Sequence, residues 1–121
     1  MIKNKIIIGT RGSKLAILYA EKAKKAIESC RSDSNKITID IKIIKTSGDI
    51  HHSKNLSEIG GTGLFSKQIE EELLNQKIDI AVHALKDLPS DETDGLETKI
   101  FLKRNDPRDV FISLNYKSIF D

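Results

Sequence analysis

An uninterrupted run of β-branched residues near the start of the chain, Ile6-Ile7-Ile8, places the strongest constraint on its fold. A strand without polar alternation is usually buried on both faces, as in a parallel sheet covered by helices. The run ends at Gly9-Thr10-Arg11-Gly12-Ser13, where Ser13 is a suitable N-cap for a helix. Apolar residues then recur at helical spacing: Leu15, Leu18, Tyr19, Ala23, Ala26 and Ile27. The opening of the chain therefore predicts a buried strand that leads into a helix, which ends between Ser29 and Ser34.

The next two elements are predicted from a change of period. Residues 37–43 place isoleucine at every second position, which is the period of a strand. After residues 46–49 the pattern dissolves, and residues 51–55 are expected to form a loop. A second helix is expected after Leu64-Phe65, with its apolar face directed inward. The side chains expected on that inward face are Ile69, Leu73 and Leu74.

The last part of the chain predicts further strands. Residues 78–83 are expected to form one strand, and Pro89 limits any helix after it to about one turn. Strands are also expected at residues 99–102 and 110–113. The order strand, helix, strand, helix, strand predicts an α/β fold with a mostly parallel sheet flanked by helices.

Composition restricts the class of protein. A chain of 121 residues is the size of one domain, and a net charge of +2 among 31% charged residues gives no nucleic-acid footprint. The lone Cys30 cannot form an internal disulfide and suits a reducing compartment. No segment has the length of a membrane span or the features of a signal peptide. We therefore expect a soluble cytoplasmic domain that binds neither nucleic acid nor membranes.

Two segments lie where ligands bind in open α/β sheets, just beyond the carboxyl ends of strands. In the first, Arg11 and Ser13 open a helix and suit a carboxylate or phosphate. The alternative is a capped helix with a solvated arginine. In the second, Lys86 could hold an anion while Asp87 accepts N–H groups or stabilises positive charge. The alternative there is a surface ion pair.

Other polar features favour structural roles. His51-His52 is not expected to bind a metal, because adjacent side chains point apart and no other ligand lies at suitable spacing. Residues 60–63 are glycine-rich but no Gly-Lys-Ser/Thr follows, so a hinge or a tight entry into the next helix is favoured over a phosphate-binding loop. His83 closes a buried strand and is expected to be a satisfied core histidine.

Taken together, the motifs resemble the hydroxymethylbilane synthase family, also called porphobilinogen deaminase. The matching segments occur in the family's order and spacing across nearly the whole chain. They are residues 8–16, 46–49, 60–67 with Glu70, 79–89 and 104–109. Residues 79–89, which contain Lys86 and Asp87, give the closest match.

The resemblance implies a transferase of tetrapyrrole and haem biosynthesis. Such an enzyme condenses four porphobilinogen molecules head to tail, releases ammonia at each step and gives hydroxymethylbilane. The product grows on a dipyrromethane cofactor that is bound covalently to a cysteine. The family has three domains and is usually monomeric, and its first two domains resemble the lobes of type-2 periplasmic binding proteins.

The resemblance also implies roles for individual residues. Arg11, Ser13 and Lys86 would contact carboxylates of the cofactor or of porphobilinogen and its oligomers. Asp87 matches the catalytic aspartate, which lies near pyrrole N–H groups and stabilises the cationic azafulvene formed when ammonia leaves. Phe65 matches an aromatic position that packs against a pyrrole ring.

Several positions depart from the family pattern. Tyr19 stands where the family has a glutamine, and Ala84 stands where it usually has a serine. Glu58 and Thr62 replace two lysines that are common in bacterial members. Each change removes a polar contact or reverses a charge near an anionic ligand, so reduced activity is expected.

The resemblance assigns residues 1–103 to an N-terminal domain 1, and residues 104–121 to the crossing segment and the start of a truncated domain 2. The family's Gly-Thr-Ser-Ser-x-Arg-Arg segment and its cofactor-bearing cysteine are absent, and Cys30 does not match that cysteine. We therefore expect an N-terminal fragment that is inactive alone and could associate with a separately made remainder. The alternatives are a stand-alone anion-binding lobe and a non-catalytic remnant.

Overall fold

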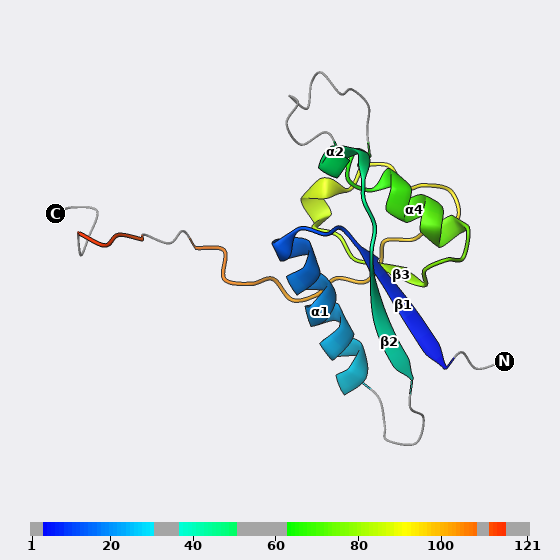
Figure 1. Cartoon of the computed structure of the whole chain (residues 1–121), viewed down its shortest axis with the longest axis horizontal. Coiled ribbons are helices and arrows are strands. Elements are labelled where there is room, and N and C mark those ends of the chain that lie inside the picture. The colour runs from blue at the N-terminus through cyan, green and yellow to red at the C-terminus, as the bar shows by residue number, and fades with distance from the viewer. Residues whose placement is uncertain (1–3, 31–36, 51–62, 109–111, 116–121) are drawn as a thin grey trace.

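The computed structural model describes residues 4–30, 37–50, 63–108 and 112–115. Three strands form a parallel sheet in the order β2-β1-β3, which confirms the predicted α/β class (Figure 1). The elements are β1 (Lys5–Thr10), α1 (Lys14–Ser29), β2 (Thr38–Ile43), α2 (Ser47–Ile50), α4 (Lys67–Leu74), β3 (Ile80–Ala81) and the 3-10 turn η1 (Leu85–Asp87).

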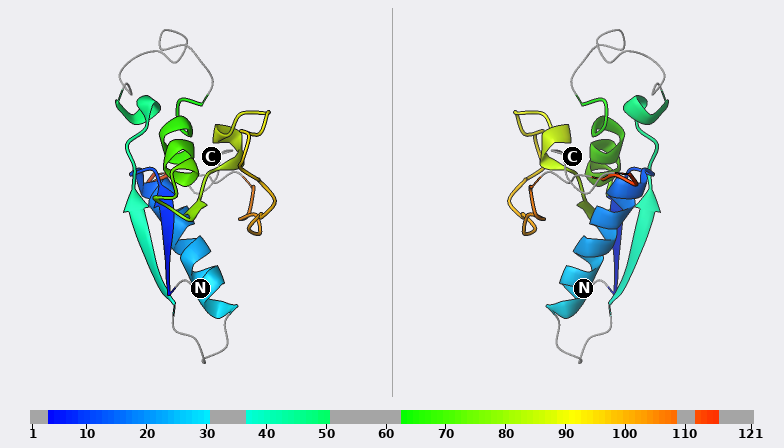
Figure 2. Two further views of the ribbon diagram at one scale, coloured as in Figure 1. Left: turned by 90° about the vertical axis from the view of Figure 1, so that its right-hand side faces the viewer. Right: turned by 90° about the vertical axis from the view of Figure 1, so that its left-hand side faces the viewer.

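The central strand β1 is buried from both sides, as its apolar run predicts. Ile8 is fully buried and packs with Ala20 and Ala23 of α1 in one cluster. Ile7 belongs to a second cluster, built around Ile69 of α4 and Ile78. Because neighbouring residues of a strand point to opposite faces, the two clusters lie on opposite faces of the sheet. Figure 2 shows α1 running alongside the two long strands.

Helix α1 begins where the sequence predicts, because the Ser13 side chain accepts a hydrogen bond from the backbone N–H of Ala16 at 3.3 Å. Its buried face differs from the expected stripe. The buried positions are Ala20 and Ala23, whereas Leu15 and Leu18 are 52% and 63% exposed. The small alanine side chains pack against the sheet, and the two leucines lie on a face of α1 that is turned toward solvent.

Strand β2 keeps the predicted alternation. Ile39 is buried, and Ile37 and Ile41 pack against the same cluster on the α1 side. On the other face, Lys42 forms an ion pair with Glu72 of α4. The alternating pattern therefore separates an apolar face from a charged one, although the last isoleucine of the series, Ile43, is 56% exposed.

The strand predicted at residues 78–83 is only two residues long in the sheet. Backbone N–H groups of Asp79 and Val82 donate to carbonyl oxygens of β1 on either side of it. Among the described residues, β3 pairs with β1 alone, over two residue pairs. The one-turn helix predicted before Pro89 is confirmed as η1.

Two expectations for the apolar residues are wrong, and a third falls only partly within the described residues. Residues 99–102 form no strand, and Ile100 is 89% exposed; this segment leads toward α1, where Lys22 Nζ donates to the Lys103 carbonyl oxygen (Figure 1). Residues 112–113 are also not in a strand, while 110–111 lie outside the described residues. Leu74 is 48% exposed at the end of α4, because it lies outside the face that packs on the sheet.

Candidate functional site

The candidate site forms where the three strands of the sheet end. Arg11 follows β1 directly, Asp49 lies in α2 just after β2, and Asp87 lies in η1 just after β3. Because the strands are parallel, their carboxyl ends meet at one edge of the sheet, which is where ligands bind in open α/β folds. The sequence order therefore places these three charged side chains next to one another.

Arg11 and Asp49 form the strongest pair of the site. Arg11 Nη2 lies 2.6 Å from Asp49 Oδ1, and Arg11 Nε lies 3.1 Å from the same oxygen. The two side chains are only 20% and 24% exposed. Parallel N–H groups of a guanidinium that meet one carboxylate fix its orientation as well as its position.

Thr46 completes this pair from the end of β2. Its hydroxyl is fully buried and donates to Asp49 Oδ2 at 2.7 Å. Burial raises the pKa of Asp49, but the hydrogen bonds from Arg11 and Thr46 and the charge of Arg11 outweigh it and hold the pKa below its usual range. Asp49 is therefore an anion at neutral pH, and it compensates the charge of Arg11.

Arg11 also contacts two of the other predicted site residues. Its Nη1 lies 3.7 Å from Asp87 Oδ2, which makes an ion pair. Its guanidinium carbon lies 4.1 Å from the centroid of the Phe65 ring, within the range of a cation–π interaction. The structure thus brings together Arg11, Phe65 and Asp87, which are far apart in the sequence.

The remaining two predicted residues lie at the margin. Ser13 is exposed, and its hydroxyl accepts the capping hydrogen bond of α1. Lys86 is exposed and precedes Asp87 on η1. Two cations, Arg11 and Lys86, therefore accompany two carboxylates, so the cluster suits a ligand that carries both acidic groups and N–H donors.

Residues 6–121 match the model of the family described as "Porphobilinogen deaminase, dipyromethane cofactor binding domain". The chain belongs to the porphobilinogen deaminase family. It is 46% identical over 117 residues to a porphobilinogen deaminase of Clostridioides difficile, and this match covers 96% of the chain. It is 45% identical over 120 residues to that of Chlorobaculum parvum and 47% identical over 116 residues to that of Rickettsia akari, covering 99% and 96% of the chain. The chain spans about 38% of the length of each of these relatives.

Asp49 and Thr46 are the residues of this candidate site that sequence reasoning missed. Both lie in a segment that resembles the family, but no role was expected for either side chain. The signal was their position directly after the second parallel strand, the place that singled out Arg11 and Asp87 after the first and third. Two positions that depart from the family pattern, Tyr19 and Ala84, are half-buried, whereas Glu58 and Thr62 lie outside the described residues.

His83 is not the satisfied core histidine that the sequence suggested. Its Nε2 atom is buried and has no hydrogen-bond partner among the described residues. Burial lowers the pKa of His83 and outweighs the opposing charges of Glu70 and Asp87, which raise it. The imidazole is therefore held in its neutral form.

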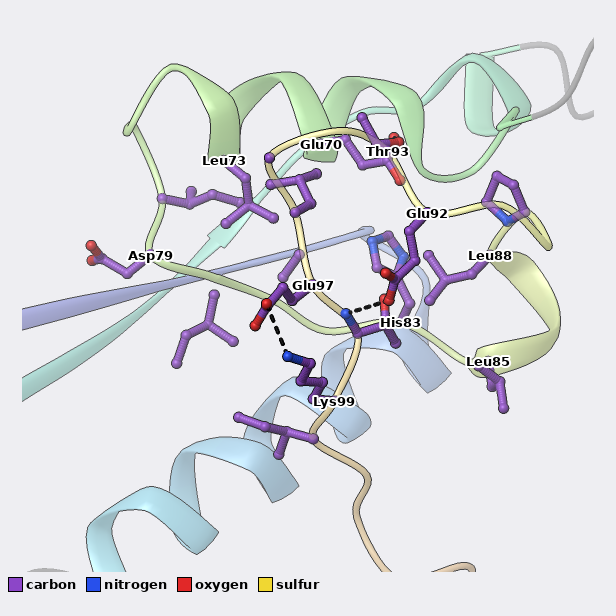
Figure 3. A pocket seen from close by; sticks show the side chains of 18 of the residues that line it. Glu70, Leu73, Asp79, His83, Leu85, Leu88, Glu92, Thr93, Glu97 and Lys99 are labelled. Atoms are coloured by element: carbon purple, nitrogen blue, oxygen red, sulfur yellow. Dashed lines mark hydrogen bonds and ion pairs between the residues drawn. The ribbon is translucent and has the colours of Figure 1, made fainter.

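A separate cavity of the described chain is lined by none of the site residues Arg11, Phe65 and Asp87. It measures about 740 Å³ and lies between α4, β3 and residues 91–101, with His83 on its inner side (Figure 3). Lys99 is the only lysine or arginine among the described residues that line it. Its lining carboxylates are Glu70, Asp79, Asp91, Glu92 and Glu97. This excess of negative charge repels a carboxylate ligand, whereas the Arg11 cluster contains a guanidinium that can attract one.

No cluster of histidine, cysteine, aspartate or glutamate in the described part of the chain is suited to hold a metal ion. His51 and His52, and the glycine-rich residues 60–62, lie outside the described residues. Within the described ranges, no helix combines the length and apolar character needed to cross a bilayer.

Proposed function

We propose that this chain belongs to a hydroxymethylbilane synthase (porphobilinogen deaminase) and supplies the cluster that binds substrate and carries out catalysis. Asp87 is the catalytic residue of this cluster. The reaction joins four porphobilinogen molecules head to tail and releases ammonia at each step. The observation that carries the proposal is the meeting of Arg11, Phe65 and Asp87 at one edge of the sheet.

The chemistry of porphobilinogen fits this cluster group by group. Its acetate and propionate carboxylates match the cations of Arg11 and Lys86, and Ser13 follows two residues after Arg11 as the N-cap of α1. The face of the pyrrole ring suits the Phe65 ring. The Asp87 carboxylate accepts pyrrole N–H groups, and it stabilises the positive charge that develops as ammonia leaves.

The same residues fit part of the dipyrromethane cofactor, because that group carries the same carboxylates and N–H donors. When bound, the cofactor supplies the pyrrole end on which the product grows. Cys30 does not fit as its attachment point. It caps the far end of α1, and a helix of 16 residues separates it from Arg11 by about 24 Å at 1.5 Å per residue.

We further propose that residues 1–103 form a lobe of the type-2 periplasmic-binding-protein kind and that 104–121 begin the crossing to a second domain. The parallel sheet and the ligand cluster at its carboxyl edge support this reading. The activity would then need the remaining two-thirds of the family length, as a partner or as part of a longer chain. A cytoplasmic location follows from the pathway and suits the free thiol of Cys30.

Titration of the purified chain with porphobilinogen, followed by calorimetry, tests the proposal. We expect saturable binding that weakens at least about tenfold in Arg11→Gln, because a carboxylate loses its charged donor. Arg108→Gln is the matched control, since Arg108 is an exposed arginine that also pairs with an aspartate. Equal loss in both variants, or equal affinity for inorganic phosphate, would favour the stand-alone anion-binding lobe.

The intact mass of the chain after incubation with porphobilinogen provides the second readout. We expect an unmodified mass and no release of ammonia from the isolated chain. A dipyrromethane adduct on Cys30, together with turnover, would contradict the assignment of the attachment cysteine to another part of the enzyme.

A further inference from the structure

We propose that Asp49 is a positioning residue of this site: it anchors Arg11 and thereby keeps the guanidinium from closing onto Asp87. The inference rests on the proposed function, because its value lies in leaving both Arg11 and Asp87 available to a pyrrole ligand. It concerns a side chain for which the sequence suggested no role.

The first step is the unequal sharing of Arg11 between two carboxylates. Asp49 receives hydrogen bonds from both Nη2 and Nε of Arg11, with a shortest distance of 2.6 Å. Asp87 approaches only Nη1, and 3.7 Å is too long for a hydrogen bond. Both carboxylates are close enough to attract the guanidinium, so something other than charge decides which one holds it.

The second step is the fixation of Asp49 from the protein side. Thr46 donates its hydroxyl to Asp49 Oδ2 at 2.7 Å, and the Asp49 backbone N–H donates back to that hydroxyl at 3.3 Å. These two hydrogen bonds hold the Asp49 carboxylate through contacts that do not involve Arg11. A preorganised acceptor loses less conformational entropy when it binds a guanidinium, and it therefore wins the competition.

The third step is the fixation of α2 itself. Ser47 exchanges two hydrogen bonds with Gln68 of α4, at 2.6 and 3.1 Å. The Gly48 N–H donates to the Leu64 carbonyl oxygen at 2.8 Å. The short helix that carries Asp49 is thus tied to the start of α4, so the anchor for Arg11 belongs to the packed part of the fold.

These contacts predict the direction in which loss of the Asp49 charge changes the affinity for porphobilinogen. Without the Asp49 charge, Arg11 is free to form a close pair with Asp87, which consumes donors and acceptors that the ligand needs. Binding of porphobilinogen then weakens. Simple electrostatics gives the opposite result, because removal of a negative charge beside an anionic ligand strengthens its binding. The direction of the change in affinity therefore separates an anchor from a nearby charge.

The test is calorimetric titration of the full 121-residue chain with porphobilinogen, for the wild type, Asp49→Asn and Asp106→Asn. Asp106 is the matched control, because it pairs with an arginine through the same kind of contacts on the exposed surface. We expect about tenfold weaker binding in D49N and no change in D106N. Unchanged or tighter binding in folded D49N overturns the inference.

Arginine side-chain NMR of the same proteins reports the pair without a ligand. In the wild type we expect slow solvent exchange of the Arg11 Nε–H and restricted rotation of its guanidinium, and D87N should retain both. In D49N the restricted signals should move, and in D49N/D87N they should disappear. Loss of restriction in D87N alone would show that Asp87 is the anchor and would overturn the inference.

The two measurements distinguish failure of the proposed function from failure of the proposed role of Asp49. If the wild-type chain does not bind porphobilinogen, the proposed function fails, while NMR still decides whether Asp49 holds Arg11. If D49N does not fold, as judged by circular dichroism, the comparison of wild type with D87N decides the question. Binding by the wild type with identical Arg11 signals in all variants rejects the anchor alone.

Discussion

At the scale of single residues, the site is a set of charges that nearly cancel. Arg11 is matched by Asp49 and faces Asp87, and the exposed Lys86 adds a second cation at the margin. The pairing of Arg11 with Asp49 and Asp87 lowers the cost of holding these three ionic groups in a partly buried place. An anionic ligand can therefore be bound only by N–H donors that Asp49 does not already occupy. These are the Lys86 ammonium and the Arg11 Nη1 group, which faces Asp87.

His83 provides the prediction at this scale. Burial lowers its pKa in the folded chain from the ordinary value of 6.5, despite the raising effect of Glu70 and Asp87. The unfolded chain therefore binds a proton more readily, and His83 contributes stability above pH 6.5 that is lost as the pH falls through that value toward the lowered pKa.

We expect the free energy of unfolding to fall when the wild-type chain is taken from about pH 7 to about pH 5, and to fall less in His83→Gln. Urea denaturation followed by circular dichroism at the two pH values measures both slopes. An identical loss of stability in the two proteins would mean that His83 is not the group that takes up the proton.

At the scale of elements, the ligand cluster depends on how α2 packs on the segment before α4. Gly48 is buried against the Phe65 ring, so closely that a Cβ atom at Gly48 would overlap it. Phe65 in turn lies under the Arg11 guanidinium. One glycine therefore sets the distance between two elements that both supply side chains to the site.

Gly48→Ala should force α2 and the Phe65 ring apart. We expect a loss of about 1–3 kcal/mol in the free energy of unfolding, the usual cost of an overpacked core, together with weaker porphobilinogen binding. Gly12→Ala is the matched control, because its Cβ would meet only the exposed Ile43 side chain, which can move. Urea denaturation of both variants measures the effect, and equal stability of the two would contradict this packing argument.

The elements also show what the sequence alone could predict. The apolar run of β1, the alternation of β2 and the Ser13 cap are local signals, and each predicted its element correctly. Arg11 and Asp87 could be placed together because both follow strands of a parallel sheet.

The remaining features depend on contacts that a local pattern does not contain. The Arg11–Asp49 pair joins residues 38 positions apart. Their positions after neighbouring parallel strands bring them to one edge of the sheet, but they do not show that Arg11 pairs with Asp49 rather than with Asp87. The rotation of α1 that exposes Leu15 depends on how closely Ala20 approaches the sheet. The apolar residues 99–102 satisfy a strand pattern, but a strand needs a hydrogen-bonded neighbour, and none of the described strands supplies one.

At the scale of the whole molecule, stability rests on a few side chains. Ile8 is fully buried in the cluster between the sheet and α1, and it is one of only seven buried hydrophobic residues in the described chain. A small core of this kind gives each member a large share of the total, since a domain is stable by only about 5–15 kcal/mol.

We expect Ile8→Ala to reduce the free energy of unfolding by about 2–5 kcal/mol, through lost burial and the cavity it leaves. Ile100→Ala is the matched control, because Ile100 is 89% exposed and its truncation should change stability by less than about 0.5 kcal/mol. Thermal unfolding of the three proteins provides the comparison. Similar melting temperatures for both variants would place the core elsewhere.

The position of β1 at the centre of the sheet has a consequence for synthesis on the ribosome. β1 can pair with β2 as soon as the first strand–helix–strand unit has emerged, but its other edge must wait for β3. The Ile7 N–H, for example, donates to the Asp79 side chain, 72 residues later. At about 5–20 residues per second, this edge stays open for roughly 4–14 s. During that interval the nascent chain presents an isoleucine-rich strand edge to its surroundings, so we expect the yield of folded protein to depend on translation speed as well as on final stability.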